Sequence, residues 1–243
     1  MRIKALLTLC IIPFLLFYSF PMVALGAEEK EDDWQEEMIY FIMVDRFFNG
    51  NFDNDYEVDT DDPKAYHGGD IDGIIQQLDY IQSLGYTAVW ITPIMKNEPK
   101  GYHGYWIEDF MEVEEHFGTM QDAKHLVEEA HKRDMKVLFD FVVNHTGYQH
   151  PWLEDPEKED WFHEEQRMIG ESPSVLENAW LAGLPDLNTE NPEVKEYLFD
   201  AAEFWIEETG VDGFRLDTVK HVPKDFWKEF NDHVKSIKKL SDF

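Results

Sequence analysis

Cysteine is nearly absent from the sequence: Cys10 is the only one among 243 residues. It lies in an apolar amino-terminal stretch that we expect to be removed, so the mature chain is expected to form no disulfide. Disulfides are common reinforcements of exported proteins. Stability must then come from elsewhere. A bound metal ion is one candidate, because a ligand that binds only the folded state stabilises it.

Basic residues are also scarce, with 21 Lys and Arg against 51 Asp and Glu and a formal net charge of -30. Such a charge repels nucleic acid and anionic membranes and attracts cations such as calcium, although a solvated acidic surface accounts for most of it. Aromatic residues make up 15% of the chain, which argues against disorder. We therefore expect no nucleic-acid partner, and no membrane partner once the amino-terminal stretch is removed.

The amino-terminal stretch has the pattern of a targeting segment. Two basic residues precede an apolar run at 5–20, and small residues precede the acidic stretch that begins at Glu28. This pattern predicts a secretory signal peptide over residues 1–27 and a secreted, extracellular protein. An uncleaved membrane anchor is the alternative. It is disfavoured because the apolar run is short and interrupted by Pro13.

The remaining chain alternates short apolar runs with segments of helical periodicity. Buried strands are expected at 39–44, 88–91, 137–141 and 211–216. Helices are expected over 71–84, from a cap at Thr119 to 130, from a cap at Asn191 to 209, and from about Lys224. Such alternation predicts an α/β protein with a parallel sheet covered by helices.

A glycine-rich phosphate loop is missing after the first expected strand, where the sequence over 45–50 reads DRFFNG. A doubly wound fold would need such a loop for a nucleotide. Unusual polar residues instead follow each strand: Asp45 and Arg46, the loop after 91, Asn144 and His145, and the segment 217–221. This placement favours a (β/α)8 TIM barrel, whose active site lies at the carboxyl ends of its strands.

The most concentrated group of charges follows the fourth expected strand and comprises Arg215, Asp217, Lys220 and His221. Residues two apart share a face of a strand, so Arg215 can keep Asp217 ionised. An ionised carboxylate at the end of a barrel strand suits a nucleophile. The alternative is an ordinary ion pair at the end of a strand.

Four motifs in the chain resemble those of the alpha-amylase family of glycoside hydrolases, family thirteen. They read GYHGYW at 101–106, DFVVNH at 140–145, LPDLN at 184–188 and GFRLDTVKH at 213–221. The branch they resemble contains amylases, cyclodextrin glucanotransferases and maltogenic amylases. The resemblance implies a (β/α)8 barrel with a domain B inserted after strand three, of which about the first four βα units are present. It divides the chain into barrel segments at 28–145 and 191–243, with domain B at 146–190.

The resemblance also implies a role for each matching residue in a retaining reaction on α-1,4-glucans. Asp217 matches the nucleophile and Arg215 the residue that orients it. The residues that match contacts to the sugar in the cleavage subsite are His103, Tyr105, Asp140 and His145. The residues that match contacts on the leaving-group side are Lys220 and His221. A carboxylate and a flat ring suit an oxocarbenium-like transition state.

Two catalytic carboxylates of the family pattern have no counterpart before Phe243. Glu229 is the last glutamate, and it falls within a helical pattern, so we interpret it as a solvated helix residue. The chain is therefore expected to be an amino-terminal part, from a truncated gene or a fragment, without a general acid. An amylase-like accessory protein is the alternative from another class, and a glucan transglycosylase is the alternative within the family. Arg215, Asp217 and Asp140 are all present at the matching positions, which favours descent from an enzyme.

Two calcium sites are implied by the resemblance. One is formed by Asn144, Asp186, the carbonyl of His221 and, more weakly, Glu177. The other is formed by Asn49, Asn51, Asn54, Asp55, Asp70 and the carbonyl of Gly68. Oxygen ligands from separate segments suit calcium. The alternatives are that Asp186 is a turn or cap residue before the helix at 191, and that the residues at 49–55 are simply turn formers.

Overall fold

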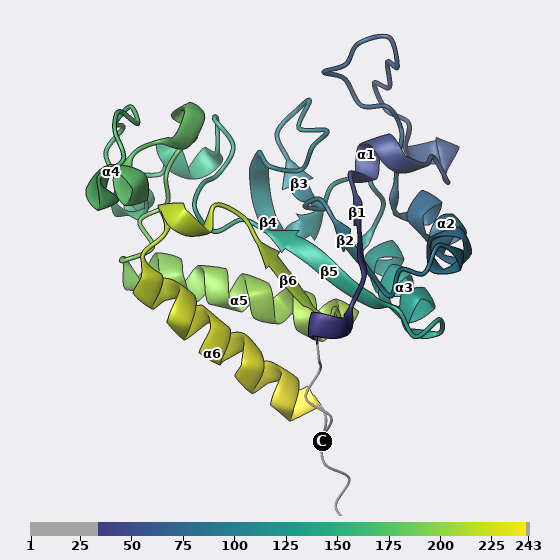
Figure 1. Ribbon diagram of the computed structural model, residues 1–243. Coiled ribbons are helices and arrows are strands. Elements are labelled where there is room, and N and C mark those ends of the chain that lie inside the picture. Colours follow the sequence, from purple (N-terminus) through teal and green to yellow (C-terminus); the bar gives the residue numbers. More distant parts are fainter. Residues whose placement is uncertain (1–33, 242–243) are drawn as a thin grey trace, which may run out of the picture. The chain divides into compact units, whose positions relative to one another are not determined.

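The computed structural model describes residues 34–241, and the unit considered below begins at Glu36. Its centre is a parallel four-stranded sheet in the order β1-β2-β5-β6 (Figure 1). The strands are β1 (Ile39–Ile42), β2 (Ala88–Ile91), β5 (Lys136–Phe141) and β6 (Gly213–Leu216). This is the sheet that the alternation of apolar runs predicted. The predicted signal peptide, with Cys10, lies outside the described residues.

The four long helices begin and end close to the positions expected from the sequence. They are α2 (Ile71–Ser83), α3 (Met120–His131), α5 (Pro192–Thr209) and α6 (Lys224–Ser241). Thr119 and Asp122 form the reciprocal capping box of α3, and Asn191 caps α5 through the amide of Glu193. Gly210 ends α5 in the left-handed conformation, with a φ of 72°. Neighbouring helices contact one another in the order α2, α3, α5, α6.

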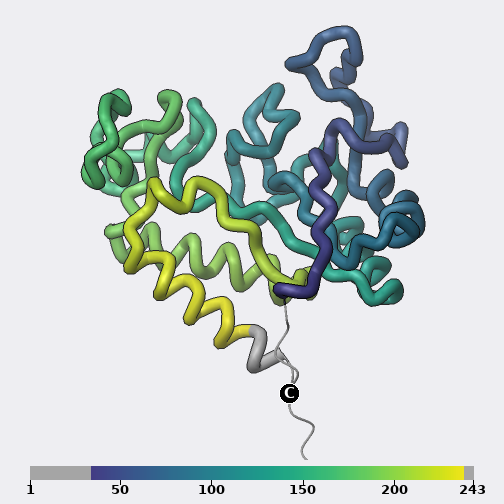
Figure 2. The backbone as a smooth tube through the Cα atoms, viewed as in Figure 1, coloured from purple at the N-terminus to yellow at the C-terminus, as the bar shows by residue number. Residues whose placement is uncertain are grey.

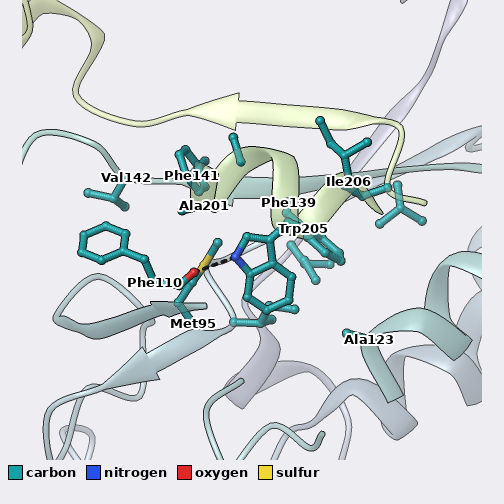
Figure 3. Packing of buried hydrophobic residues seen from close by; sticks show 14 of the residues in the cluster. Met95, Phe110, Ala123, Phe139, Phe141, Val142, Ala201, Trp205 and Ile206 are labelled. Atoms are coloured by element: carbon teal, nitrogen blue, oxygen red, sulfur yellow. Dashed lines mark hydrogen bonds between the residues drawn. The ribbon is translucent and has the colours of Figure 1, made fainter. Parts of the chain in front are cut away.

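The hydrophobic core lies between the sheet and these helices. Trp205 of α5 is fully buried, and its Nε1 donates a 2.7 Å hydrogen bond to the carbonyl of Phe110 (Figure 3). Its ring meets that of Phe139 of β5 edge-on at 5.8 Å. Phe230 of α6 packs on Phe141 at 5.8 Å. The helices are therefore joined to the sheet mainly through large aromatic side chains.

Two details of the strands differ from the sequence-based expectation. The first strand ends at Ile42, because Met43 begins a short helix, α1 (Val44–Phe47), instead of continuing to 44. A hairpin of β3 (Met95–Asn97) and β4 (Ile107–Val113) was not predicted. Its strands pair with shifts in register on both sides of Lys96, so no regular alternation marks them in the sequence.

The fourth strand is less buried than expected, because β6 is an edge strand of the described sheet. Val211 before it is buried, but all four residues of β6 are only half-buried. At the opposite edge Ile39 and Phe41 of β1 are 43% and 47% exposed. The expectation of a fully buried strand at 211–216 is therefore wrong, since β6 lacks a second neighbour among the described residues.

The segment at 146–190 consists of short helical turns within the same compact unit (Figure 2). They are η3 (Pro151–Glu154), η4 (Pro156–Trp161), α4 (Pro173–Asn178) and η5 (Leu181–Gly183). Trp152 and Trp161 pack on Tyr197 of α5 at 4.9 and 5.7 Å, which attaches the segment to the barrel helices. The boundaries of domain B stay a prediction. None of the helices in residues 34–241 has the length and apolar character needed to cross a membrane.

Candidate active site

Arg215 holds two carboxylates at the carboxyl ends of neighbouring strands. Its Nη1 lies 2.7 Å from Oδ1 of Asp217 and 3.1 Å from both oxygens of Asp140. Arg215 and Asp217 share one face of β6, as the two-residue spacing predicted, and β5 pairs Asp140 directly with Arg215. The parallel register therefore brings three of the expected residues into one charged cluster.

Asp140 is fully buried and accepts hydrogen bonds from several sides. Its Oδ2 accepts from the hydroxyl of Tyr105 at 2.8 Å and from Nε1 of Trp90 at 3.1 Å. Burial raises the pKa of Asp140 to about 6, against the opposing influence of the Tyr105 hydrogen bond and of Arg215. Trp90 was not predicted from the sequence. It also lies under the Arg215 guanidinium, whose carbon is 4.7 Å from the ring centre.

The aromatic loop 101–106 brings His103 and Tyr105 to the same place. Their rings stack at 5.8 Å, and Nδ1 of His103 accepts the amide of Tyr105 at 3.0 Å. Gly104 between them has a φ of 89°, and a Cβ there would lie 2.2 Å from the carbonyl of Pro93. The tight turn therefore requires glycine. Tyr105 is placed beside the carboxylates as expected, and burial raises its pKa.

His145 follows β5 and is buried, and burial lowers its pKa to about 4. The ring is therefore neutral at pH 7. Its Nε2 has no hydrogen-bond partner within residues 34–241. The ring lies near Asp217 and the backbone of Tyr105. The structure thus places His145 beside the other expected sugar contacts.

The chain turns sharply after Asp217. Thr218 has a φ of 49°, which is strained for a β-branched residue, and a 3-10 turn, η6 (Val219–His221), follows. Lys220 is exposed on this turn. His221 is buried, and its Nδ1 lies 2.9 Å from the carbonyl of Leu176 in α4. The two residues expected on the leaving-group side therefore differ in environment, with only Lys220 open to solvent.

Asn144 and Asp186, two expected calcium ligands, are buried together. Nδ2 of Asn144 donates to Oδ1 of Asp186 at 3.0 Å. The other oxygen, Oδ2, lies 2.7 Å from Nδ1 of His163, a residue that the sequence did not single out. Burial raises the pKa of Asp186 to about 6. Glu177 lies half-buried on α4, which contacts the turn that carries His221. The four residues therefore come from adjoining segments, but His163 already compensates the Asp186 carboxylate.

The second expected set gathers around Asp55 in the loop after α1. Nδ2 of Asn49 donates to both oxygens of Asp55 at 2.9 Å, and a Cβ on Gly68 would lie 2.7 Å from Oδ1 of Asp55. The Oδ1 atoms of Asn49 and Asn54 are buried, with no hydrogen-bond partner among the described residues. Orphaned oxygens beside a carboxylate are suitable ligands for calcium. Asn49, Asn54 and Asp55 therefore offer oxygens that fit the ion.

Asn51 and Asp70 of the same set bind backbone amides. Oδ1 of Asn51 accepts the amide of Asp53 at 3.0 Å and caps η2 (Phe52–Asn54). The Asp70 carboxylate caps α2 through Gly73 at 2.6 Å and also accepts the amides of Gly50 and Asn51. Their role as calcium ligands stays a prediction. No three His, Cys, Asp or Glu side chains within 34–241 are grouped closely enough for a metal ion, so both expected sites depend on amide and carbonyl oxygens.

Glu229 lies on α6 and forms a 2.6 Å ion pair with Lys195 of α5. It is a solvated helix residue, as interpreted from the sequence.

Comparison with known proteins identifies the family. Residues 41–239 match the alpha-amylase catalytic domain. A beta/alpha-amylase from Paenibacillus polymyxa is 45% identical over 213 residues, which is 82% of this chain and 18% of that protein. A maltogenic alpha-amylase from Bacillus acidopullulyticus is 35% identical over 91% of this chain and 40% of its own length.

Solved structures agree with these sequence matches. An Anoxybacillus alpha-amylase is 68% identical with a TM-score of 0.84, over 85% of this chain and 46% of that one. An alpha-amylase from Geobacillus thermoleovorans, complexed with acarbose, is 61% identical with a TM-score of 0.81, over 85% and 45%. The chain thus spans less than half of each of these four relatives. Its sheet and helices are those of the barrel that the sequence motifs implied, and the chain belongs to the alpha-amylase family.

Proposed function

We propose that this chain carries the nucleophile half of a retaining α-1,4-glucan-active site, with Asp217 as the nucleophile. The observation that carries the proposal is the Arg215 guanidinium between Asp217 and Asp140, at 2.7 and 3.1 Å. Arg215 orients the Asp217 oxygen. Tyr105 supplies a flat ring for the sugar, and its hydroxyl steadies Asp140. A carboxylate fixed in this way can attack the anomeric carbon of a bound glucose unit.

We further propose that the residues described lack a general acid for this reaction. Asp140 is the other carboxylate of the cluster, but it is fully buried, and its oxygens accept from Tyr105, Trp90 and Arg215. It cannot deliver a proton to a leaving glucan. General acid catalysis contributes about 10²–10⁴-fold. A polypeptide of residues 1–243 alone should therefore bind glucans but release no reducing sugar from starch.

A glycosyl fluoride tests the nucleophile separately from the acid, because fluoride leaves without being protonated. With α-maltosyl fluoride, an Asp217 oxygen forms a bond to the anomeric carbon as the carbon–fluorine bond breaks. We expect fluoride release by the chain and a maltosyl adduct on Asp217 in peptide mass spectra. Asp217→Asn should abolish both. Equal fluoride release by the two proteins would overturn the assignment, and starch hydrolysis that depends on Asp217 would overturn the missing acid.

The same experiment separates the two alternative functions. An accessory protein of the amylase type would bind maltooligosaccharides without reacting with the fluoride. A transglycosylase would transfer the maltosyl group from Asp217 to an added maltose, so that longer sugars form as fluoride is released. The intact cluster of Arg215, Asp217 and Asp140 favours chemistry at Asp217 over binding alone.

We propose calcium as the bound ion, with the Asp55 site as the better supported one. Asn49, Asn54, Asp55 and the carbonyl of Gly68 would hold it, because two buried amide oxygens there have no other partner among the described residues. Bound calcium would neutralise Asp55 and fix the loop after α1. At the second site Asn144 and Asp186 would contribute, together with the carbonyl of His221 and Glu177. Titration calorimetry should show Asp186→Ala weakening one binding event and Asp55→Ala the other.

We propose that the protein is secreted, on the basis of the apolar segment before Glu28. Amino-terminal sequencing of protein recovered from the culture medium should begin at or next to Ala27 or Glu28. Protein retained in the membrane with Met1 intact would instead support an uncleaved anchor.

A further inference from the structure

Glu98 is a buried carboxylate with no role in the reaction proposed above. It is 8% exposed and lies just after β3, in front of the loop that carries His103 and Tyr105. Burial raises its pKa, so placing it there costs free energy. The compensating contacts are backbone amides of the segment after His145. Its Oε1 accepts the amide of Gln149, and the carboxylate also accepts that of Tyr148.

The backbone of Glu98 is tied to its own loop. Its amide donates to the carbonyl of Trp106 at 2.9 Å, and its carbonyl accepts the amide of Gly101 at 2.9 Å. The first bond closes the segment 98–106, and the second forms a turn at its start. Trp106 then meets Tyr148 ring to ring at 5.4 Å. Glu98 therefore joins the aromatic loop to residues 148–149, three to four positions after His145.

Glu98 contacts the inserted segment at Gly147, where the carboxylate occupies the space that a side chain would need. A Cβ on Gly147 would lie 2.5 Å from the carboxyl carbon and Oε1 of Glu98. Gly147 is thus the residue against which the carboxylate is seated. Further along, the hydroxyl of Tyr148 lies 3.4 Å from the carbonyl of Ala182, so the connection continues into the middle of the segment 146–190.

We propose that Glu98 is a positioning residue that clamps the aromatic loop to the inserted segment and thereby fixes the glucan cleft. The inference rests on the proposed function for its ligand, an α-glucan chain. An ionised carboxylate has only acceptor sites, so it can take two adjacent amides at once. Without it, the loop bearing His103 and Tyr105 and the segment after His145 would be joined by fewer contacts, chiefly Trp106 on Tyr148 and the Gly147 amide on the carbonyl of Ile107, and would move more freely. The sugar contacts from the two sides would then be held less firmly at their spacing.

A double-mutant cycle between Glu98 and Gly147 tests the clamp. Glu98→Ala removes the acceptor, and Gly147→Ala displaces the carboxylate with a methyl group. Each should speed hydrogen exchange of the Tyr148 and Gln149 amides at least ~10-fold and raise the dissociation constant of the full chain for maltoheptaose ~10-fold. In the Glu98→Ala background, Gly147→Ala should add nothing. Glu98→Gln, which keeps one acceptor oxygen, should restore part of the affinity.

Glu112→Gln is the matched control, since Glu112 is an exposed carboxylate on the same hairpin, paired with Lys96. It should change neither amide exchange nor affinity. Additive effects of the two alanine substitutions, or unchanged exchange in Glu98→Ala, would overturn the clamp. If Glu98→Ala fails to fold, the same cycle is run with Glu98→Gln. The exchange measurement needs no glucan, so it decides the clamp even if the wild-type chain binds no maltoheptaose. That failure to bind would instead overturn the proposed function.

Discussion

The Oδ1 atom of Asp217 lies 2.7 Å from Nη1 of Arg215, two residues earlier on the same strand. The same nitrogen contacts Asp140, which the neighbouring strand β5 supplies. One guanidinium therefore sets the spacing between the expected nucleophile and Asp140, the carboxylate that accepts the Tyr105 hydroxyl. The orientation of Asp217 depends on this shared cation and on the parallel pairing of β5 with β6.

Arg215→Lys should lower fluoride release from α-maltosyl fluoride by about 10²-fold, a typical cost of removing one preorganised electrostatic group. A lysine ammonium is a compact charge on a flexible stem, and it cannot reproduce the planar guanidinium that lies over the Trp90 ring with Nη1 between both carboxylates. Lys195→Gln, which breaks an exposed ion pair between α5 and α6, serves as the control and should leave the rate unchanged. Similar rates for Arg215→Lys and the wild type would contradict the role of Arg215.

Calcium should raise the melting temperature of the chain, and Asp55→Ala should remove most of that increase. The physical reason is that the ion binds the folded loop and not the unfolded chain. Asp55 is preferred to Asp70 for this test, because Asp70 caps α2 and its loss would destabilise the helix even without an ion. Asp61→Ala, in an exposed part of the same loop, is the control and should keep the full response. Limited proteolysis of residues 45–75 should follow the same pattern.

His150 should make the protein less stable as the pH falls below neutral. Burial lowers its pKa to about 4, whereas the unfolded value is 6.5, so the unfolded chain binds the proton first. The contribution of His150 to the free energy of unfolding is fully present above pH 6.5 and is lost as the pH falls toward 4. The loss is roughly 2 kcal/mol at pH 5. His150→Asn keeps an acceptor for the Trp152 amide but does not titrate. Urea unfolding at pH 7 and pH 5 should therefore show a smaller difference for the variant; identical differences would contradict the assignment.

Trp205→Phe should lower the free energy of unfolding by about 1–3 kcal/mol. It removes the indole that donates to the carbonyl of Phe110 and leaves a small void in the core (Figure 3). Trp227→Phe is the matched control. Trp227 also donates to a carbonyl, that of Val219, but it is only partly buried on α6, so water can replace the bond. Equal losses for the two substitutions would show that burial of Trp205 is not the cause.

The helices and most strands could be predicted from the sequence, because their determinants are local. Thr119 and Asp122 form a capping box three residues apart, and Gly210 stops α5 with a positive φ. The hairpin β3–β4 could not be predicted in this way. Its pairing is irregular around Lys96, so its partners are specified by contacts across the hairpin and not by alternation along the chain.

The residues of the candidate site were also largely visible in the sequence, through four motifs and the two-residue spacing of Arg215 and Asp217. Trp90, His163 and Glu98 were missed. Each is a single residue in an apolar strand or a loop, and each acts through a partner at least 23 positions away. The one local indication was the half-buried position of Trp90 in β2, and it did not identify Asp140 as the partner.

The sequence by itself determined the family, the order of the main strands and helices, and Asp217 as the expected nucleophile, since these depend on short motifs and local periodicity. Only the tertiary structure decided which polar and charged side chains are partners of one another. It gave Asp140 three donors in Trp90, Tyr105 and Arg215, assigned His163 to Asp186, and seated Glu98 against Gly147. The physical reason is that electrostatic and packing energies depend on distance in space, and the parallel register of the sheet places residues 75 positions apart within 3.1 Å.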